Sequence, residues 1–357
     1  MSDVLTDQSQ DDRKVNIYDI SRESGVSIAT VSRVMNNSGY VSDKTRKKVM
    51  DVIQRNGYSP NAFARGMSKS TMSIVGILCS DSRDPYQAEC IYWLQKDLAQ
   101  AGYTAMLCCT GEDLKTLEGD VSLLLSRSVD ALICIGSGFA GGKEKNWEAL
   151  VQAAAKVPVI LLNGEMEKKN IYSIVCDDEK GMQELTSLVL KTGGVSPLFL
   201  AGSPSPSSQD KLRGFRQCMK DHGFDDKEIR VTAIEADLDK MSDELKKIYE
   251  EKPFDAILCC DDQTALGALK FTEQNHLKVP EQVQITGYNG SLLSRLSSLQ
   301  ITTYDNRLSY LCSQAVFALQ AVLSKQSYPR QSLYTGQLIP GETTRQTPTE
   351  RKSGFGH

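Results

Sequence analysis

The residues that could carry enzymatic chemistry do not form the pattern of an enzyme in this sequence. Only three histidines occur among the 357 residues, and none lies near a plausible nucleophile. The sequence has no GxSxG elbow, no GxxxxGK[ST] phosphate loop and no CxxC pair. No cluster has the spacing of metal ligands. We therefore expect a protein that is not an enzyme and that has no metal site and no cofactor.

Cysteine is the other residue type that could do chemistry, and ten cysteines occur. Most lie in apolar, strand-like stretches, namely Cys79, Cys108, Cys109, Cys134, Cys176, Cys259 and Cys260. We expect these to be reduced, buried thiols that behave as small hydrophobic side chains. The adjacent pairs 108–109 and 259–260 could suggest a redox sensor. Thiols in apolar strands should stay protonated and inert, so we do not favour that interpretation.

One glycine motif could bind a dinucleotide. Residues 136–141 read GSGFAG, a literal GxGxxG that follows a predicted strand and precedes a predicted helix. Glu165 follows the next predicted strand, where an acid that binds ribose could lie. However, two strand–helix units precede the motif, whereas this fingerprint usually opens its sheet. We prefer a loop that lines a ligand cleft and keep a nicotinamide-dinucleotide site as the alternative.

The elements that must position any ligand site are alternating strands and helices. From about residue 72, apolar strand-like runs such as IVGILCS, DALICIGS and VPVILLN are separated by amphipathic helices. A second series of similar size follows YSIVCDD and includes PLFLAGS and DAILCCD. This pattern predicts two α/β lobes with parallel sheets and a cleft between them, since ligands bind beyond the carboxyl ends of such strands. No run of 18 apolar residues occurs, so we expect no membrane span.

The segment before this body predicts three short helices. Asn16 can cap a helix that begins at Ile17, and Gly25 can end it. Ser27 can cap a second helix that runs to about residue 36. Ser42 can start a third helix, which runs through Arg55. Two helices joined by a glycine turn, the second short and amphipathic, are typical of a helix-turn-helix.

Charge separates this head from the rest of the chain. Residues 13–69 carry eleven Lys and Arg against four Asp and Glu, a net charge of +7. Residues 1–12 carry −4, and residues 70–357 carry −7. A basic head on an acidic body indicates a polyanionic partner for the head alone.

The order of residues in the head resembles the lactose-repressor (LacI/GalR) family of bacterial transcription regulators. The resemblance lies in GVSIATVSRVMN, VSDKTRKKV and GYSPNAFARGM, and it extends over essentially the whole chain. It implies that Ile28, Ala29 and Arg33 face base edges in the major groove, where Arg33 suits guanine. It also implies a set of phosphate contacts that fix register, at Ser27, Thr30, Ser32, Asn36, Ser42, Thr45 and Tyr58.

The resemblance further identifies residues 61–67 as a hinge helix that folds on the operator. Asn61, Ala64 and Met67 match its DNA-facing positions, and Met67 stands where the family has a leucine wedge. Methionine is apolar and flexible, so its side chain can also insert as a wedge in the minor groove. With a small Ala29 in the recognition helix, we expect a palindromic operator with a central CpG.

The family pattern also implies an effector site at the ends of the strands. Its positions correspond to Ser80, Asp81, Tyr86, Ser137, Asn163, Lys211, Phe215, Asp261, Asn289 and Asn306. Carboxylates, amides and an aromatic ring suit a small polyol or sugar. Three positions depart from the sugar-binding pattern: Lys211 replaces an arginine, and Asn163 and Asn289 stand where acids are frequent.

The sequence thus predicts a cytoplasmic, homodimeric DNA-binding regulator, most simply a repressor, controlled by a small molecule that binds between two periplasmic-binding-protein-like lobes. We expect a disordered tail (1–15), a head (16–60), a hinge and linker (61–71), a core (72–348) and a polar tail (349–357). Lobe 1 would comprise about 72–172 and 302–332, and lobe 2 about 173–301 and 333–348. Besides the dinucleotide sensor, the alternative is a sugar-binding sensor that does not bind DNA, which the basic head argues against.

Overall fold

The computed structural model describes residues 15–35, 39–57, 71–111, 114–139, 146–202, 204–233 and 238–346. The chain separates into two compact units, Met1–Met72 and Ser73–His357. Five predicted DNA-contact positions, Asn36, Tyr58, Asn61, Ala64 and Met67, lie outside the described residues.

The described residues of the first unit form three helices around a small apolar core. They are α1 (Ile17–Ser24), α2 (Ile28–Met35) and α3 (Asp43–Arg55). The predicted start signal of α1 is a capping box: the Asn16 side chain accepts the backbone N–H groups of Tyr18 and Asp19, and the Asp19 carboxylate accepts the Asn16 N–H. The turn to α2 requires Gly25, whose φ of 65° is left-handed. The buried core comprises Ile20, Val31, Val34, Val49 and Val52.

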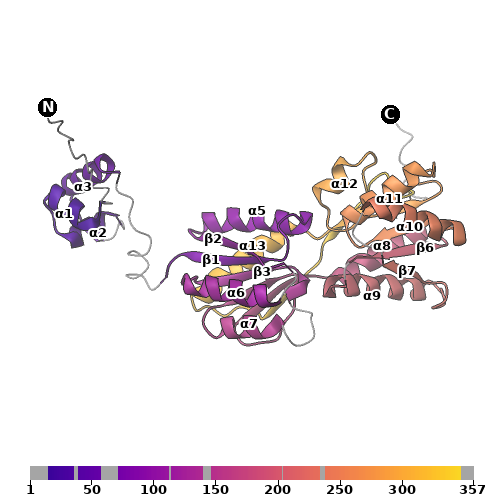
Figure 1. Ribbon diagram of the computed structural model, residues 1–357, viewed down its shortest axis with the longest axis horizontal. Helices are drawn as coiled ribbons and strands as arrows, with labels where there is room; N and C mark the ends of the chain where they lie inside the picture. The colour runs from indigo at the N-terminus through magenta and orange to yellow at the C-terminus, as the bar shows by residue number, and fades with distance from the viewer. Residues whose placement is uncertain are drawn as a thin grey trace, which may run out of the picture. The chain divides into compact units, whose positions relative to one another are not determined.

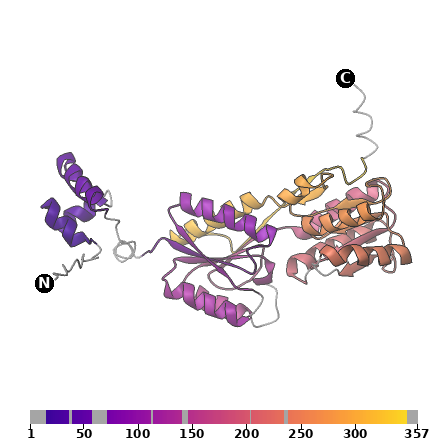
Figure 2. The same ribbon diagram turned by 45° about the horizontal axis from the view of Figure 1, so that its top comes forward.

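Lobe 1 of the second unit is a six-stranded parallel sheet between two helical layers. The strand order is β11-β5-β4-β3-β1-β2. Helices α5 and α13 pack on one face and α6 and α7 on the other (Figures 1 and 2). The strands are β1 (Ile74–Cys79), β2 (Thr104–Cys109), β3 (Ala131–Ile135), β4 (Val159–Leu162), β5 (Ile171–Cys176) and β11 (Gln331–Tyr334). The helices are α5 (Pro85–Gln100), α6 (Leu114–Ser126), α7 (Asn146–Ala154) and α13 (Leu308–Leu323).

Lobe 2 repeats this three-layer plan on a smaller parallel sheet of order β7-β6-β8-β9. Its strands are β6 (Pro197–Ala201), β7 (Arg230–Ala233), β8 (Ala256–Cys259) and β9 (Gln284–Thr286). Helices α8 (Asp178–Lys191) and α9 (Pro206–Asp221) cover one face, and α10 (Leu238–Glu251) and α11 (Asp262–Gln274) cover the other. Two elements were not predicted: the short α12 (Leu292–Leu296) and the antiparallel pairing of β10 (Thr303–Asp305) with β12 (Gln337–Ile339).

The chain passes between the lobes three times, at positions that differ slightly from the predicted ones. It crosses after β5, after β10 and after β11. The predicted boundary near residue 172 falls inside β5, which pairs with β4 and β11 and so belongs to lobe 1. The boundary near 332 likewise falls inside β11. Apolar runs identify strands, but they do not show which sheet a strand joins, so periodicity alone could not place these crossings.

Burial corrects one prediction about the cysteines. Most are buried as expected, and none of the ten is in a disulfide. Cys109, however, is exposed, and Cys108 is half-buried. Both lie on β2, which is the edge strand of its sheet, so fewer neighbours cover them than cover a central strand.

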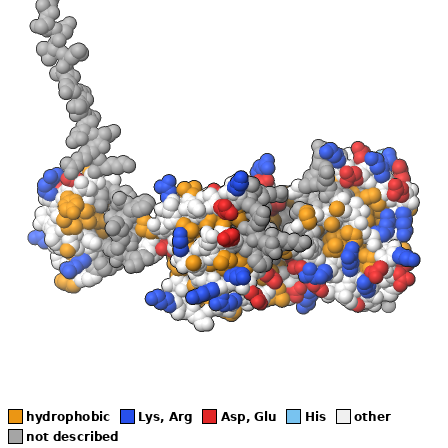
Figure 3. Space-filling view, turned by 60° about the horizontal axis from the view of Figure 1, so that its bottom comes forward, with side chains coloured by type: hydrophobic (Ala, Val, Ile, Leu, Met, Phe, Trp, Pro, Cys, Tyr) orange, Lys and Arg blue, Asp and Glu red, His pale blue; other side chains and the backbone are white. Residues whose placement is uncertain are grey.

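Two further properties of the described residues bear on function. No helix among them is long and apolar enough to cross a membrane. On the face of the second unit that Figure 3 shows, acidic and basic side chains are interspersed rather than gathered by sign.

The contact between α8 and α9 yields a stability prediction. A Cβ added at Gly214 would lie 2.1 Å from the Glu179 carbonyl oxygen, so Gly214→Ala must push the helices apart. We expect a loss of about 2–3 kcal/mol in the free energy of unfolding, measured by urea titration of the full chain with circular dichroism. Gly119→Ala is the control, because this exposed glycine in α6 has no atom within 4 Å of the added Cβ. The control should gain about 0.5–1 kcal/mol. Equal effects of the two substitutions would contradict the close packing.

Candidate functional site

The second helix of the first unit presents the predicted base-reading side chains on its outer face. Val31 and Val34 are buried in the core, whereas Ala29 and Arg33 are exposed and Ile28 is 38% exposed. An apolar side chain left exposed beside an arginine on a short helix is suited to contact base edges. The structure therefore keeps these three side chains available to a partner of the head.

Two of the predicted phosphate contacts, Ser27 and Ser42, also cap helices. The Ser27 and Thr30 hydroxyls are 2.9 Å apart, and Thr30 N–H donates to Ser27 Oγ at 3.2 Å. Ser42 and Thr45 repeat this arrangement at the start of α3, with hydroxyls 2.9 Å apart. Ser32 is half-buried on α2. Two helix N-termini with their hydroxyls on the surface can accept an anion, since the helix dipole favours negative charge there.

The second unit contains a cleft of about 460 Å³ that both lobes line. In lobe 1 it lies beyond β1 and β3, the adjacent strands at which the strand order reverses. In lobe 2 it lies beyond β6 and β8, the corresponding reversal point of the smaller sheet. Ligands of open α/β sheets bind at such switch points, so the topology itself places the site.

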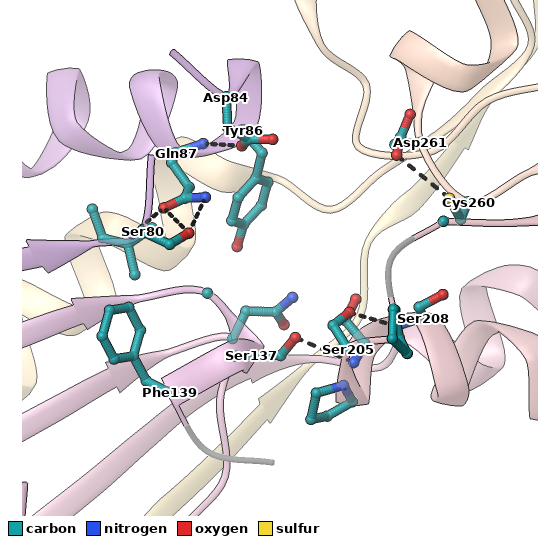
Figure 4. A pocket seen from close by; sticks show the side chains of 18 of the residues that line it. Ser80, Asp84, Tyr86, Gln87, Ser137, Phe139, Ser205, Ser208, Cys260 and Asp261 are labelled. Carbon is teal, nitrogen blue, oxygen red and sulfur yellow. Dashed lines mark hydrogen bonds between the residues drawn. The ribbon is translucent and has the colours of Figure 1, made fainter. Parts of the chain in front are cut away.

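One lobe 1 wall is formed by Ser80, which follows β1, together with Asp84, Tyr86 and Gln87 at the start of α5 (Figure 4). Gln87 Oε1 accepts the Ser80 N–H at 2.8 Å, and Gln87 Nε2 donates to Ser80 Oγ at 2.9 Å. Asp84 caps α5 by accepting the Gln87 N–H at 2.8 Å, and burial raises the pKa of its carboxyl. The Tyr86 hydroxyl has no hydrogen-bond partner among the described residues, which makes it a candidate donor to a ligand.

The rest of the lobe 1 wall follows β3 and β4. Ser137 and Phe139 belong to a single 3₁₀ turn, η1 (Ser137–Phe139), and both side chains are buried. Asn163 follows β4 with a left-handed φ of 59°, and its Oδ1 accepts the Cys176 N–H at 3.2 Å. Phe139 was not predicted as a site residue. It supplies an apolar surface in this wall, whereas the predicted aromatic residues of the cleft were Tyr86 and Phe215.

The lobe 2 wall is the first turn of α9 together with Lys211. Lys211 is only 6% exposed; its Nζ donates to the Cys260 carbonyl at 2.9 Å and lies 4.1 Å from the centre of the Tyr288 ring. No carboxylate lies within ion-pair distance of Lys211 in the described part of the chain. A buried ammonium with one hydrogen-bond acceptor and an aromatic face can still donate to a ligand.

Asp261 and Asn289 complete the lobe 2 side. Asp261 caps α11 by accepting the Thr264 N–H at 2.6 Å, and it faces the cleft from the end of β8 (Figure 4). Asn289 follows β9 with a φ of 98°, and its Oδ1 accepts a bond from Asn306 Nδ2 at 3.2 Å. Left-handed backbone at two asparagines, Asn163 and Asn289, suits this residue type better than most.

The structure thus brings seven of the ten predicted effector residues to one cleft: Ser80, Tyr86, Ser137, Asn163, Lys211, Asp261 and Asn289. Three predicted residues do not line it. Asp81 pairs with exposed Arg83 at 2.9 Å. Phe215 is fully buried and stacks on Phe199, with ring centres 5.2 Å apart. Asn306 is buried behind Asn289, and its Oδ1 has no partner among the described residues.

A lining group that the sequence did not reveal is the serine-rich start of α9. Ser205, Ser207 and Ser208 all line the cleft. The Ser207 N–H donates to Ser137 Oγ at 3.3 Å, so the two lobes are hydrogen-bonded across the cleft. The signal was present as SPSPSS, but a Ser/Pro run before a helix is equally typical of an ordinary cap and turn.

Behind the cleft, the buried carboxylate of Asp178 connects Ser207 to Tyr288. Asp178 is 4% exposed; its Oδ2 accepts from Ser207 Oγ at 2.5 Å and its Oδ1 from the Tyr288 hydroxyl at 3.0 Å. Burial, reinforced by the Asp178 charge, raises the pKa of Tyr288 well above its ordinary value. Asp178 is the first residue of α8, directly after the first crossing between the lobes, so the cleft wall is tied to that crossing.

The GxGxxG motif does not form a dinucleotide turn in its described part. Gly136 has a left-handed φ of 102°, but nothing lies within 4 Å of a Cβ built at Gly138. The residues that follow form a 3₁₀ turn, with Phe139 in the cleft wall. Glu165, the candidate ribose-binding acid, is exposed and does not line the cleft. This geometry favours the predicted cleft loop.

Each of the two units matches a known protein family. Residues 16–61 match the family described as bacterial regulatory proteins, lacI family, and residues 72–313 match periplasmic binding proteins and sugar binding domain of LacI family. The chain therefore belongs to the LacI family of DNA-binding transcription regulators, as its sequence predicts, and is not an enzyme.

Individual relatives cover nearly the full chain. An HTH-type transcriptional regulator of Lachnoclostridium phytofermentans is 36% identical over 92% of this chain and 99% of its own length. A sucrose operon repressor of Pediococcus pentosaceus is 27% identical over 92% and 99%. The Lac repressor dimer bound to operator and the anti-inducer ONPF has a TM-score of 0.84 at 22% identity, covering 94% of this chain and all of that one. This last likeness shows the shared fold.

Asp262, next to cleft residue Asp261, yields a pH prediction. Its Oδ2 accepts the Ser291 N–H at 2.7 Å and its Oδ1 the Thr303 hydroxyl at 2.6 Å, beside the loop that carries Asn289. Burial raises its pKa from 3.8 to about 6. The folded protein therefore holds this proton more tightly than the unfolded chain, and stability must fall as pH rises from about 4 to about 6.

We expect this one group to lower the free energy of unfolding by on the order of 2 kcal/mol across that pH window. Asp262→Asn should remove that part of the pH dependence. Asp243→Asn, at an exposed position of α10, should retain it. Urea titrations of the full chain at several pH values measure the difference, and identical pH profiles for Asp262→Asn and the unsubstituted protein would refute the assignment.

Proposed function

We propose that this protein is a homodimeric transcriptional repressor whose operator binding is controlled by a small neutral polyol or sugar in the cleft between its lobes. The observation that carries the proposal is the union, in one chain, of a helix-turn-helix head with a polar cleft placed at the switch points of two sheets. The absence of a membrane span among the described residues and the DNA-binding family are consistent with a cytoplasmic location.

The head supports binding to a palindromic operator. A two-fold dimer presents two heads to two half-sites, so the symmetry of the site mirrors that of the protein. Ile28, Ala29 and Arg33 would face base edges, and the Ser27–Thr30 and Ser42–Thr45 pairs would hold phosphates at two helix N-termini. A central CpG and a Met67 wedge remain part of this proposal, with Asn61 and Ala64 in the same hinge.

The cleft supports a carbohydrate effector by its hydrogen-bonding groups. Tyr86 and Lys211 can donate, Asp84 and Asp261 can accept, and the asparagine amides can do both. Phe139 supplies an apolar wall on which a ring can pack. One relative is itself named a sucrose operon repressor, and a regulator of the same fold, CelR, has been solved with cellobiose at 20% identity and a TM-score of 0.67.

Control would follow from a shift between two lobe arrangements. The Ser207–Ser137 hydrogen bond joins the two lobes, and the bond from Ser207 to Asp178 connects this contact to the first crossing. A ligand that changes these bonds therefore changes the relative stability of the two lobe arrangements. A ligand can shift this balance only by its preference for one arrangement. We propose that this shift alters the spacing of the two heads.

The proposed operator contacts of the head can be tested with Arg33→Ala. Selection from a random duplex pool should yield a palindrome, and Arg33→Ala should weaken binding to it by about 1–3 kcal/mol while relaxing one base position. The control is Arg55→Ala, which removes an equal charge at the end of α3, where Arg55 lies 3.9 Å from Glu23. Gel retardation across salt concentrations measures both. A non-palindromic consensus, or equal losses for the two variants, would contradict the proposed reading head.

The effector part predicts ligand-dependent stabilisation of the full chain. The test is a thermal-shift screen of neutral mono- and disaccharides, their phosphates and NADH. We expect a neutral sugar to raise the melting temperature, because the ligand binds the folded state. Lys211→Met should lower the affinity for that sugar at least tenfold, whereas Lys115→Met, on the exposed face of α6, should not. Saturable micromolar binding of NADH instead would favour the dinucleotide alternative.

A further inference from the structure

Two thiols lie side by side at the rim of the cleft. Cys79 ends β1 and Cys109 ends β2, and the two residues are register partners in adjacent parallel strands. Their sulfur atoms are 3.5 Å apart. Neighbouring strands are about 4.8 Å apart, which lies within the range of about 4.4–6.8 Å that a disulfide allows between Cα atoms. The backbone therefore already has the separation that a bond between these sulfurs requires.

The two thiols differ in access to solvent. Cys109 is exposed on the edge strand, whereas Cys79 has no exposed surface. Burial, with Cys109 beside it, raises the pKa of the Cys79 thiol to about 12. Cys79 is thus protected from direct oxidation, and Cys109 is the sulfur that a soluble oxidant reaches first.

We propose that Cys79 and Cys109 form a reversible disulfide in response to a hydroperoxide, and that this bond alters the lobe 1 rim of the cleft. The Cys109 sulfur attacks the peroxide O–O bond, giving a sulfenic acid and one water. The Cys79 sulfur then attacks the sulfenic sulfur, the S–O bond breaks, and a second water leaves with the two remaining protons. Two thiols lose two electrons, and one hydrogen peroxide becomes two waters.

The position of the pair explains how the bond would reach the cleft. Ser80 directly follows Cys79, and Thr110 and Gly111 directly follow Cys109; all three line the cleft. The Cys79 carbonyl accepts the Thr110 N–H at 2.8 Å. Bond formation brings the sulfurs from 3.5 Å to about 2 Å and links the ends of β1 and β2 covalently, so the two strand ends lose their freedom to move apart.

Other cysteine neighbours in the described chain lack this combination of contact and access. Cys90 and Cys312 are both buried between α5 and α13, where no oxidant reaches them. Cys259 ends β8 and Cys260 directly follows it, and the two pack in clusters on opposite faces of the sheet. Cys108 packs on the α6–α7 side of its sheet, away from Cys79. Cys108 therefore provides a matched control one residue from the proposed site.

The test is oxidation of the full chain with hydrogen peroxide, followed by tryptic mapping without reduction. We expect free thiols to fall from ten to eight, a linked pair of peptides spanning 70–83 and 97–115, and full reversal by dithiothreitol. Cys108→Ser should retain the link, and Cys109→Ser should abolish it. In Cys79→Ala, Cys109 sulfenic acid should persist and react with dimedone, while circular-dichroism melting checks that each variant folds.

Hydrogen exchange measures the effect on the rim. Amides of 104–111 should exchange at least threefold more slowly in the oxidised protein, and Cys109→Ser should show no such change. The proposal is overturned if the link disappears in Cys108→Ser, if it joins two chains on a non-reducing gel, or if no linked peptide forms and Cys109 takes no dimedone in Cys79→Ala. A disulfide that leaves exchange of 104–111 unchanged overturns the effect on the cleft.

Discussion

The body of this regulator depends on two buried tyrosines packed against each other where the chain crosses between its lobes. The rings of Tyr288 and Tyr304 have centres 5.4 Å apart, and neither side chain is exposed. A Cβ at Gly181 would lie 2.4 Å from the Tyr288 hydroxyl, and one at Gly336 would lie 2.6 Å from the Tyr304 ring. The segments that follow the first and third crossings therefore touch this pair directly. Tyr304 itself lies just before the second, so all three crossings share one packed core.

This shared core also sets the chemistry of the cleft. Tyr288 gives its hydroxyl to Asp178 and its ring face to Lys211, and Asp178 in turn fixes the Ser207 hydroxyl. An isolated carboxylate or ammonium is costly to bury, and here each is stabilised by hydrogen bonds or an aromatic face rather than by an ion pair. A wall built in this way has little freedom to repack. A change at the crossings must therefore alter the positions of Lys211 and Ser207 together.

The positions of helices and strands could be predicted from the sequence, but the sheet to which each strand belongs could be predicted less well. Periodicity and caps predicted the head helices and α13, because these signals are local. Assigning β5 and β11 to lobe 1 depends on pairing between strands about 160 residues apart, which no local pattern encodes. The same limit applied to the cleft. Family positions brought seven residues together, but whether Phe139 or Phe215 lines the cleft depends on packing, since Phe215 stacks on Phe199. Cys109 was misjudged because an edge strand and a central strand have the same apolar pattern.

The hydrogen bond between Ser207 N–H and Ser137 Oγ limits how a ligand can act on this cleft. It joins the lobes directly, so an arrangement of the lobes that separates these two serines must replace this contact with bonds of similar strength. Each such bond contributes only about 1 kcal/mol net, which is comparable to the differences that separate two lobe arrangements. Small changes in the ligand, such as the orientation of one hydroxyl, can then decide which arrangement is favoured. Because the walls are hydrogen-bonded across the lobes, a ligand of the proposed polyol class would be selected by small differences in its hydrogen bonds.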